Sequence, residues 1–286
     1  MIALSSRPSR VGPVALASAF VTLAALAGCR SGAPTVEPGL SPREQAVEHY
    51  MAGWSAIMDE GRWTLAEAEF RAAMAADPDW VLGRALVGRI TRNVEEREEL
   101  LDWIERHLDQ APNDERLLLD IYVHHIAEYN ERDRGIAPDP ERSERRQRLH
   151  IANSRRYLER HPGTPYVSAE LVEYVHAADG AEAALHVLNT EIAPSAASIP
   201  FCLGYRARML TELGRYHEAF AVADALDARL DDPLAPAQHV VRARILLRTG
   251  QLEEASARID TALALDGNNL AAWVVRELIR VETAKR

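Results

Sequence analysis

Residues 50–78, YMAGWSAIMDEGRWTLAEAEFRAAMAADP, predict two short helices joined by a turn at Gly61. Ala66, Phe70 and Ala73 recur at helical spacing, so one face of the second helix carries small, large and small side chains in turn. Small side chains let a neighbouring helix approach closely, and the aromatic ring between them fills the groove. One such helix pair cannot bury its own apolar face, so we expect the rest of the chain to supply more pairs.

This stretch resembles the tetratricopeptide repeat, in which a turn glycine and an aromatic residue precede alanine, an aromatic residue, alanine and proline. In the first unit these positions are Gly61, Trp63, Ala66, Phe70, Ala73 and Pro78. In two later units the matching positions are Gly214, Tyr216 and Ala219, then Gly250, Ala255 and Ala262. The resemblance covers about residues 43–281 and implies a right-handed superhelical solenoid of antiparallel helix pairs. The first unit departs from the family at Gly53 and Trp54, where a large residue is usually followed by a small one, which shifts the register by one residue.

Helix-ending residues recur at a regular interval along the chain. Pro78 and Pro112 are 34 residues apart, Gly180 and Gly214 are also 34 apart, and Gly214 and Gly250 are 36 apart. A period near 34 residues is typical of a helix-turn-helix array. No run between turn signals alternates apolar and polar residues over the length of a strand. We therefore predict an all-α fold of about 13 helices, in six units and a terminal helix.

The chain divides into three parts by composition. Residues 1–28 are predicted to be a cleaved signal peptide, residues 29–42 a flexible tether rich in proline and glycine, and residues 43–286 the repeat domain. One unit, at about residues 113–162, is enlarged, because its bounding prolines are 50 residues apart. The last predicted element is a capping helix at residues 269–284.

The capping helix is expected to be amphipathic. Its apolar face is predicted from Leu270, Trp273, Val274, Leu278 and Val281, and its polar outer face from Arg276, Glu277 and Arg280. Repeat arrays need a terminal helix whose outer face is polar. We therefore expect the apolar face to pack against the preceding unit.

The N-terminus has the features of a secretory signal. Arg7 and Arg10 precede an apolar run at residues 11–27, which is short for a membrane-spanning helix. The run ends in LAGC, at residues 26–29, which resembles the lipobox of bacterial lipoproteins. The resemblance implies cleavage before Cys29 and acylation of its thiol and its new amino group. The alternative is an uncleaved membrane anchor with a chance cysteine.

Lipidation at Cys29 would hold the protein to a membrane, because several acyl chains give a lasting anchor where one binds only marginally. The expected location is the cell envelope. Arg30 follows the cysteine, and in the family's sorting rule a residue other than aspartate there favours the outer membrane, facing the periplasm, in a Gram-negative source.

Cys202 is the other cysteine. We expect it to be buried and structural, with a reactive thiol as the alternative.

Composition and motifs exclude several functions. The 286-residue chain has a formal net charge of −10, whereas nucleic-acid binding needs a basic surface. The sequence has no phosphate-binding loop, dinucleotide-binding glycine motif, nucleophile elbow, zinc-protease motif or paired-cysteine motif. His124 and His125 are adjacent and so point about 100° apart on a helix, whereas shared metal ligation favours a spacing of three or four. We therefore expect no enzyme activity, no cofactor and no metal.

Two arginine-rich features could select a partner. Residues 142–160 are locally basic and could meet anionic headgroups or an acidic partner, but interleaved glutamates favour a helix stabilised by pairs four residues apart. In the resembled family, the first helix of each unit lines a groove that holds a peptide. Arg208 and Arg244 occupy matching groove positions in successive units, and Arg248 lies one turn further on. These arginines suit an acidic peptide or a C-terminal carboxylate, and the alternative is that they are ordinary exposed arginines.

The sequence therefore predicts a membrane-anchored, non-catalytic scaffold that binds other envelope proteins or peptides, with neither a nucleic acid nor a small-molecule substrate. The first alternative is an envelope enzyme, or an accessory subunit of one, that acts on peptidoglycan or polysaccharide. The second alternative is a structural lipoprotein that associates with itself. Converging carboxylates or histidines in a deep pocket would favour the enzyme, and a large exposed apolar patch would favour self-association.

Overall fold

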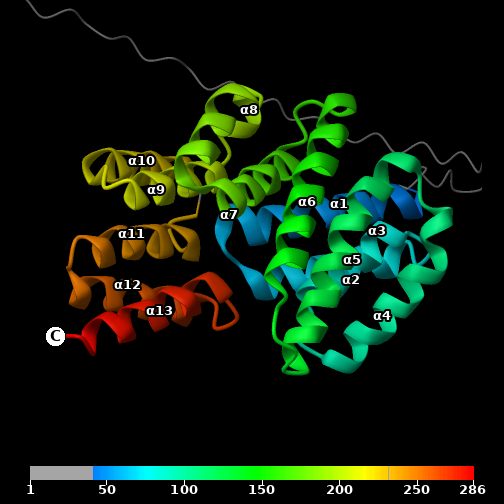
Figure 1. Ribbon diagram of the computed structural model, residues 1–286, viewed down its shortest axis with the longest axis horizontal. Coiled ribbons are helices and arrows are strands. Elements are labelled where there is room, and N and C mark those ends of the chain that lie inside the picture. The colour runs from blue at the N-terminus through cyan, green and yellow to red at the C-terminus, as the bar shows by residue number, and fades with distance from the viewer. Residues whose placement is uncertain (1–40, 231) are drawn as a thin grey trace, which may run out of the picture. The chain divides into compact units, whose positions relative to one another are not determined.

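A computed structural model describes residues 41–230 and 232–286 of the chain (Figure 1). These residues form thirteen α-helices and no strand, so the predicted all-α fold is confirmed. The signal peptide, Cys29 and the tether up to residue 40 lie outside the described residues. Within the described part, no helix has both the length and the apolar character needed to cross a membrane.

The helices follow one another with short connections. The first seven are α1 (Pro42–Trp54), α2 (Trp63–Ala76), α3 (Val81–Ile90), α4 (Val94–His107), α5 (Asn113–Asp133), α6 (Pro140–Arg160) and α7 (Pro165–Thr190). The others are α8 (Pro194–Ala197), α9 (Pro200–Glu212), α10 (Tyr216–Arg229), α11 (Pro236–Arg248), α12 (Leu252–Leu265) and α13 (Leu270–Thr283). A π-helix, η1 (Ser55–Glu60), follows α1, and a short 3₁₀ turn, η2 (Leu108–Gln110), follows α4.

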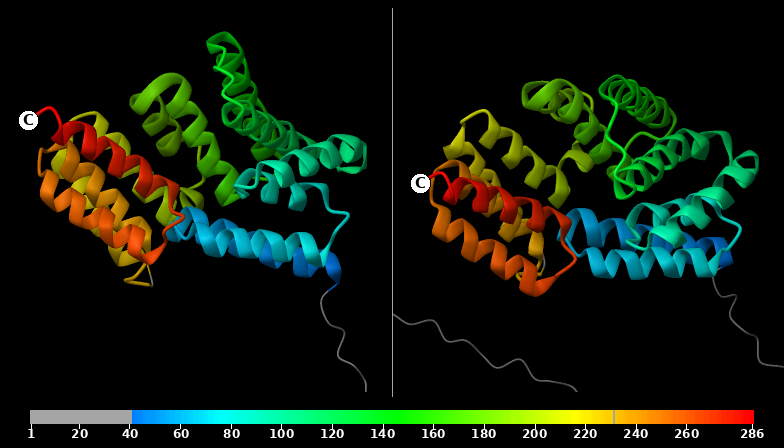
Figure 2. Two further views of the ribbon diagram at one scale, coloured as in Figure 1. Left: turned by 90° about the horizontal axis from the view of Figure 1, so that it is seen from below. Right: turned by 60° about the horizontal axis from the view of Figure 1, so that its bottom comes forward.

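Each helix packs against the next one in the sequence (Figures 1 and 2). From α3 onward, most odd-numbered helices also contact one another, in the pairs α3–α5, α7–α9, α9–α11 and α11–α13. The even-numbered helices α2, α4, α10 and α12 each pack against the two odd-numbered helices next to them in the sequence. The odd-numbered helices therefore form the inner layer from which a binding site can be built.

The first helix pair shows why small residues alternate with the aromatic residue. Ala66, Phe70 and Ala73 are all buried, at 2% exposure or less. The Phe70 ring lies directly on Gly53, where a Cβ atom would come within 2.4 Å of its Cε1 atom. Only glycine leaves room for the ring at this position.

A π-helix directly follows Gly53 and Trp54, where the sequence departs from the repeat pattern. A π-helical turn contains one residue more than an α-helical turn. η1 therefore inserts one residue between Trp54, which is buried, and the turn at Gly61. Gly61 has a positive φ of 74°, the left-handed conformation that glycine adopts without strain.

The enlarged unit consists of two long helices. α5 and α6 have 21 residues each, whereas the helices of the units around Gly61, Gly214 and Gly250 have 13 or 14. The turn between them contains Gly135, which has a positive φ of 72°. Asp139 caps α6 by accepting hydrogen bonds from the backbone N–H groups of Glu141 and Arg142, at 3.0 and 3.4 Å.

The basic segment of α6 is paired mainly with other helices. The expectation of pairs four residues apart within α6 holds only for Arg145 and Glu141, at 3.5 Å. Of the other six arginines, Arg156 forms no ion pair with the described residues, and five bridge to neighbouring elements: Arg142 to Glu131, Arg146 to Glu128, Arg148 to Asp179, Arg155 to Glu191 and Arg160 to Asp114. These ion pairs neutralise most of the positive charge, so this segment presents little free charge to an anionic partner.

The prediction for the packing face of the last helix is wrong. Ala272, Val275 and Ile279 are the buried residues of α13, at 7% exposure or less. The five residues predicted to pack inward are instead 41–47% exposed: Leu270, Trp273, Val274, Leu278 and Val281. The buried residues pack on α11 and α12, where the small side chain of Ala272 allows a close helix–helix approach. An apolar stripe therefore remains on the outside of α13.

Candidate functional site

The first and last helix pairs are joined directly by hydrogen bonds. Thr64 donates to the Asp266 carboxylate through its backbone N–H, at 3.0 Å, and through its hydroxyl, at 2.7 Å. Asn269 donates its side-chain amide to the carbonyl oxygen of Gly61 at 2.8 Å, while its own side-chain oxygen caps α13. In an open repeat array each unit contacts only its neighbours. This contact joins residues about 200 positions apart in the sequence, and Figure 2 shows the two ends side by side.

A buried carboxylate ties the π-helix to the inner layer. Asp59 of η1 accepts a hydrogen bond from the Tyr166 hydroxyl at 2.9 Å and another from the backbone N–H of Phe201 at 3.1 Å. Phe201 lies in the first turn of α9, whose N–H groups have no partner within the helix. Burial raises the pKa of Asp59, and these two donors act against that effect. Asp59 thereby holds the first unit against α9.

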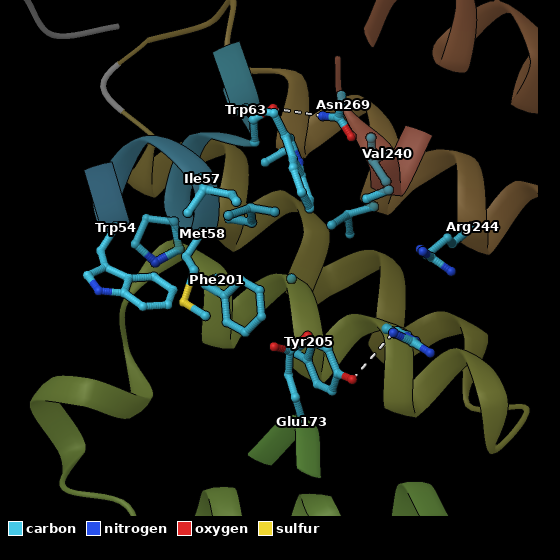
Figure 3. A pocket seen from close by; sticks show the side chains of 18 of the residues that line it. Trp54, Ile57, Met58, Trp63, Glu173, Phe201, Tyr205, Val240, Arg244 and Asn269 are labelled. Atoms are coloured by element: carbon cyan, nitrogen blue, oxygen red, sulfur yellow. Dashed lines mark hydrogen bonds between the residues drawn. The ribbon is translucent and has the colours of Figure 1, made fainter. Parts of the chain in front are cut away.

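These contacts enclose one side of a cavity of about 360 Å³ in the inner layer (Figure 3). Most of its wall is apolar or aromatic. The wall includes Trp54, Ile57, Met58 and Trp63 from the first unit, and Phe201, Tyr205, Val240 and Val241 from α9 and α11. Gly61 and Asn269, which are hydrogen-bonded to each other, also line the cavity. A ligand here would contact both ends of the described chain segment.

Two of the three predicted groove arginines line this cavity. Arg208 donates to Glu212 at 3.0 Å and to the Tyr205 hydroxyl at 3.3 Å. Arg244 lines the cavity too, but it makes no hydrogen bond or ion pair with any residue of the described part of the chain. Burial, followed by the nearby charge of Arg208, lowers the pKa of Arg244 to about 10. Arg248 is exposed and does not line the cavity.

Glu173 is the one carboxylate in the cavity lining. It enters from α7 and has no hydrogen-bond or ion-pair partner among the described residues. Burial, and then the neighbouring charge of Glu170, raise the pKa of Glu173 to about 7. The cavity thus combines an apolar wall with one unpaired guanidinium and one unpaired carboxyl group.

A buried ion pair lies behind the cavity wall. Arg89 lines the cavity from α3 and pairs with Glu170 of α7 at 2.8 Å. Glu170 also accepts hydrogen bonds from the hydroxyls of Tyr122 and Tyr174, at 3.0 and 3.1 Å. Sequence reasoning missed this network. Its signal is a charged residue within a mostly apolar helix, as in VLGRALVGRI, where Arg84 and Arg89 are the two charged residues.

A histidine cluster lies elsewhere in the fold. His150 of α6 lies close to both His124 and His125, with ring centroids 5.8 and 4.8 Å away. Each of the three has a buried ring nitrogen without a hydrogen-bond partner. Burial lowers the pKa of all three, that of His150 to about 3. No group of three or more potential ligands in the described residues has an arrangement that could hold a metal ion.

Cys202 lies on the buried face of α9 and is 1% exposed. Burial raises the pKa of its thiol to about 12, so the thiolate is scarce at neutral pH. This placement matches the structural role predicted for it.

The sequence matches no protein-family model, and a search of curated proteins gives no significant match.

Proposed function

We propose that this protein is a membrane-anchored, non-catalytic scaffold of tetratricopeptide-like repeats that binds other proteins or peptides of the bacterial cell envelope. In this proposal Cys29 carries the lipid anchor and the repeat domain carries the binding site. The anchor rests on the resemblance of residues 26–29 to a lipobox. The solenoid arrangement rests on the repeat period and on the packing of each helix against the next.

One observation carries the binding role. Arg208 and Arg244 come from successive units at matching repeat positions, and both line the same cavity. Arg244 has no acidic partner within the described residues, so a carboxylate from a bound partner would supply one. An envelope enzyme has less support, because Glu173 is the one carboxylate and no histidine lines the cavity. A single carboxylate does not provide the pair of groups that acid–base hydrolysis of a sugar bond uses.

Charge reversal tests this proposal. In native membranes, chemical crosslinking should capture binding partners of the wild-type protein. The double variant Arg208→Glu, Arg244→Glu should recover these partners at about one tenth of the wild-type level or less, because each lost charge-assisted hydrogen bond is worth roughly 1.5–3 kcal/mol. Quantitative mass spectrometry of the crosslinked material measures the recovery.

Arg248→Glu is the matched control, because Arg248 lies on α11 with Arg244 but outside the cavity. This variant should recover partners at the wild-type level. Equal recovery from the double variant and from wild type would reject the cavity as the partner site. A loss of equal size in Arg248→Glu would mean that surface charge, rather than the cavity, attracts the partners.

The exposed stripe on α13 favours a second candidate, a structural lipoprotein that associates with itself. Five large apolar side chains lie on the outer face of this single helix, and α13 is the last element of the array. A contiguous apolar patch on a protein surface commonly marks an interface. Two copies could bury this stripe against each other about a two-fold axis, because the same surface then serves on both sides.

Sedimentation of the purified protein tests self-association. If the stripe is a self-interface, wild type should sediment as a dimer, and Trp273→Glu, Leu278→Glu as a monomer, because each glutamate would bury a charge without a partner. Leu149→Glu is the control, since Leu149 is 38% exposed on α6, which packs against α5 and α7. A monomeric wild type across the accessible concentration range would remove this candidate.

A further inference from the structure

We propose that the cavity binds a small zwitterion, a free amino acid or a short peptide with an apolar side chain. Its carboxylate would meet Arg244, its amine would meet Glu173, and its side chain would pack on the aromatic wall. This inference rests on the proposed function, because it places the occupant in the same cavity. It goes further by naming the chemistry of the occupant.

The positive side of the cavity determines where a carboxylate binds. Three arginines line the cavity, and two of them already have carboxylate partners: Arg89 with Glu170 at 2.8 Å, and Arg208 with Glu212 at 3.0 Å. Arg244 has none. A guanidinium that is partly removed from water without a counter-ion is costly, and a planar carboxylate offers it two parallel hydrogen bonds. Arg244 is therefore the guanidinium with free capacity for a ligand.

The negative side determines where an amine binds. Glu173 lines the cavity without a cation or a hydrogen-bond donor from the described residues. The groups that act on its charge are Glu170 on the same helix, Arg89 from α3 and Arg208 from α9. Both arginines are already paired with other carboxylates. An ammonium group beside Glu173 would stabilise its ionised form, which burial otherwise disfavours.

Glu173 and Arg244 do not satisfy each other. They lie on α7 and α11, no ion pair joins them, and they enter the cavity from different sides (Figure 3). A ligand with only a carboxylate would leave Glu173 without a partner, and one with only an amine would leave Arg244 without one. A compound that carries both groups satisfies both residues at once.

The size and the walls of the cavity favour a short compound. Its volume of about 360 Å³ lies at the small end of the range of ligand sites, roughly 300–1,000 Å³. Trp54, Phe201 and Met58 supply apolar surface for a side chain. Gly61 and Asn269 are joined by a hydrogen bond at the edge of the cavity, so the first and last helix pairs block one side. A free amino acid or short peptide fits this space better than a long chain.

Isothermal titration calorimetry of the purified full-length protein tests the inference with defined probes. The probes are phenylalanine and leucyl-phenylalanine, each also prepared with an acetylated amine or an amidated carboxylate. We expect a free zwitterion to bind, and either blocking group to weaken binding at least tenfold. If no free zwitterion binds to the folded protein, or if both blocked forms bind as well as the free form, the inference is overturned.

Two variants assign the ligand's groups to their partners. In Glu173→Gln the free and the acetylated probes should bind with equal affinity, so the tenfold penalty for acetylation disappears, because the ligand's amine has lost its carboxylate partner. In Arg244→Gln the penalty for amidation should disappear in the same way. Arg248→Gln should keep both penalties, and circular dichroism should show equal helix content in all forms. Penalties that persist in both cavity variants would overturn the assignment.

The results also separate this inference from the proposed function. If partner capture depends on Arg208 and Arg244 while no zwitterion binds, the inference fails and the scaffold proposal stands. If a zwitterion binds with the expected penalties while capture is unaffected by charge reversal, the scaffold proposal fails and the inference stands.

Discussion

Replacing Cys29 by alanine should abolish incorporation of labelled palmitate and release the protein from the membrane fraction. The physical reason is that alanine has no thiol for the thioether bond, so no acyl chain can be attached at this position. The acyl chains contribute about 0.8 kcal/mol for each buried CH₂ group, and several chains together make the anchor lasting. Metabolic labelling followed by membrane fractionation measures both effects.

Cys202→Ala is the matched control, because it removes the chain's other cysteine. Cys202 is 1% exposed in α9, and burial raises the pKa of its thiol, so labelling should remain at the wild-type level in this variant. Unchanged labelling of Cys29→Ala would refute the lipobox interpretation. Wild-type protein that carries no label but stays in the membrane would indicate an uncleaved anchor instead.

Phe70→Ala should lower the free energy of unfolding by about 3–5 kcal/mol, the usual cost of deleting a buried phenylalanine ring. Phe70 is 2% exposed, lies on Gly53 and meets the Trp54 ring edge to face, with centroids 5.7 Å apart. The helix pair α1–α2 cannot fill the cavity left by the deleted ring, because Gly53 has no side chain to move into it. Urea denaturation followed by circular dichroism measures the change.

Leu65→Ala on the same helix is the control for Phe70→Ala. Leu65 is 43% exposed, so its truncation should cost less than about 1 kcal/mol. A loss of equal size in the two variants would show that α2 contributes through helix propensity rather than through the packing of Phe70. A loss below about 1 kcal/mol in Phe70→Ala would contradict the packing seen in the first helix pair.

The helix pairs could be predicted because their signals are local. A turn glycine such as Gly61 and the spacing of Ala66, Phe70 and Ala73 describe one pair within about 15 residues, without reference to the rest of the chain. The same spacing also predicted that Arg208 and Arg244 share a surface, because matching positions of successive units face the same way. Both residues line the cavity, although nothing in their spacing showed that Arg208 would be paired and Arg244 unpaired.

The face of the last helix could not be predicted from its pattern alone. Residues 270–283 contain more apolar positions than one packing face needs, so two apolar faces compete for the core. Hydrophobicity favoured the larger set with Trp273 and Leu278, but close packing on α11 and α12 favoured the smaller side chains of Ala272 and Val275. The exposed stripe is the outcome of that competition.

The sequence by itself determined the all-α fold and the turns at Gly61, Gly214 and Gly250, because these depend on neighbours a few residues apart. Only the tertiary structure decided that Thr64 bonds to Asp266 and that Asp59 holds Phe201. It also decided that the cavity leaves Glu173 and Arg244 unpaired. The two hydrogen bonds join residues about 140 to 200 positions apart, and their partners are chosen by how the packed helices bring them together rather than by any local pattern.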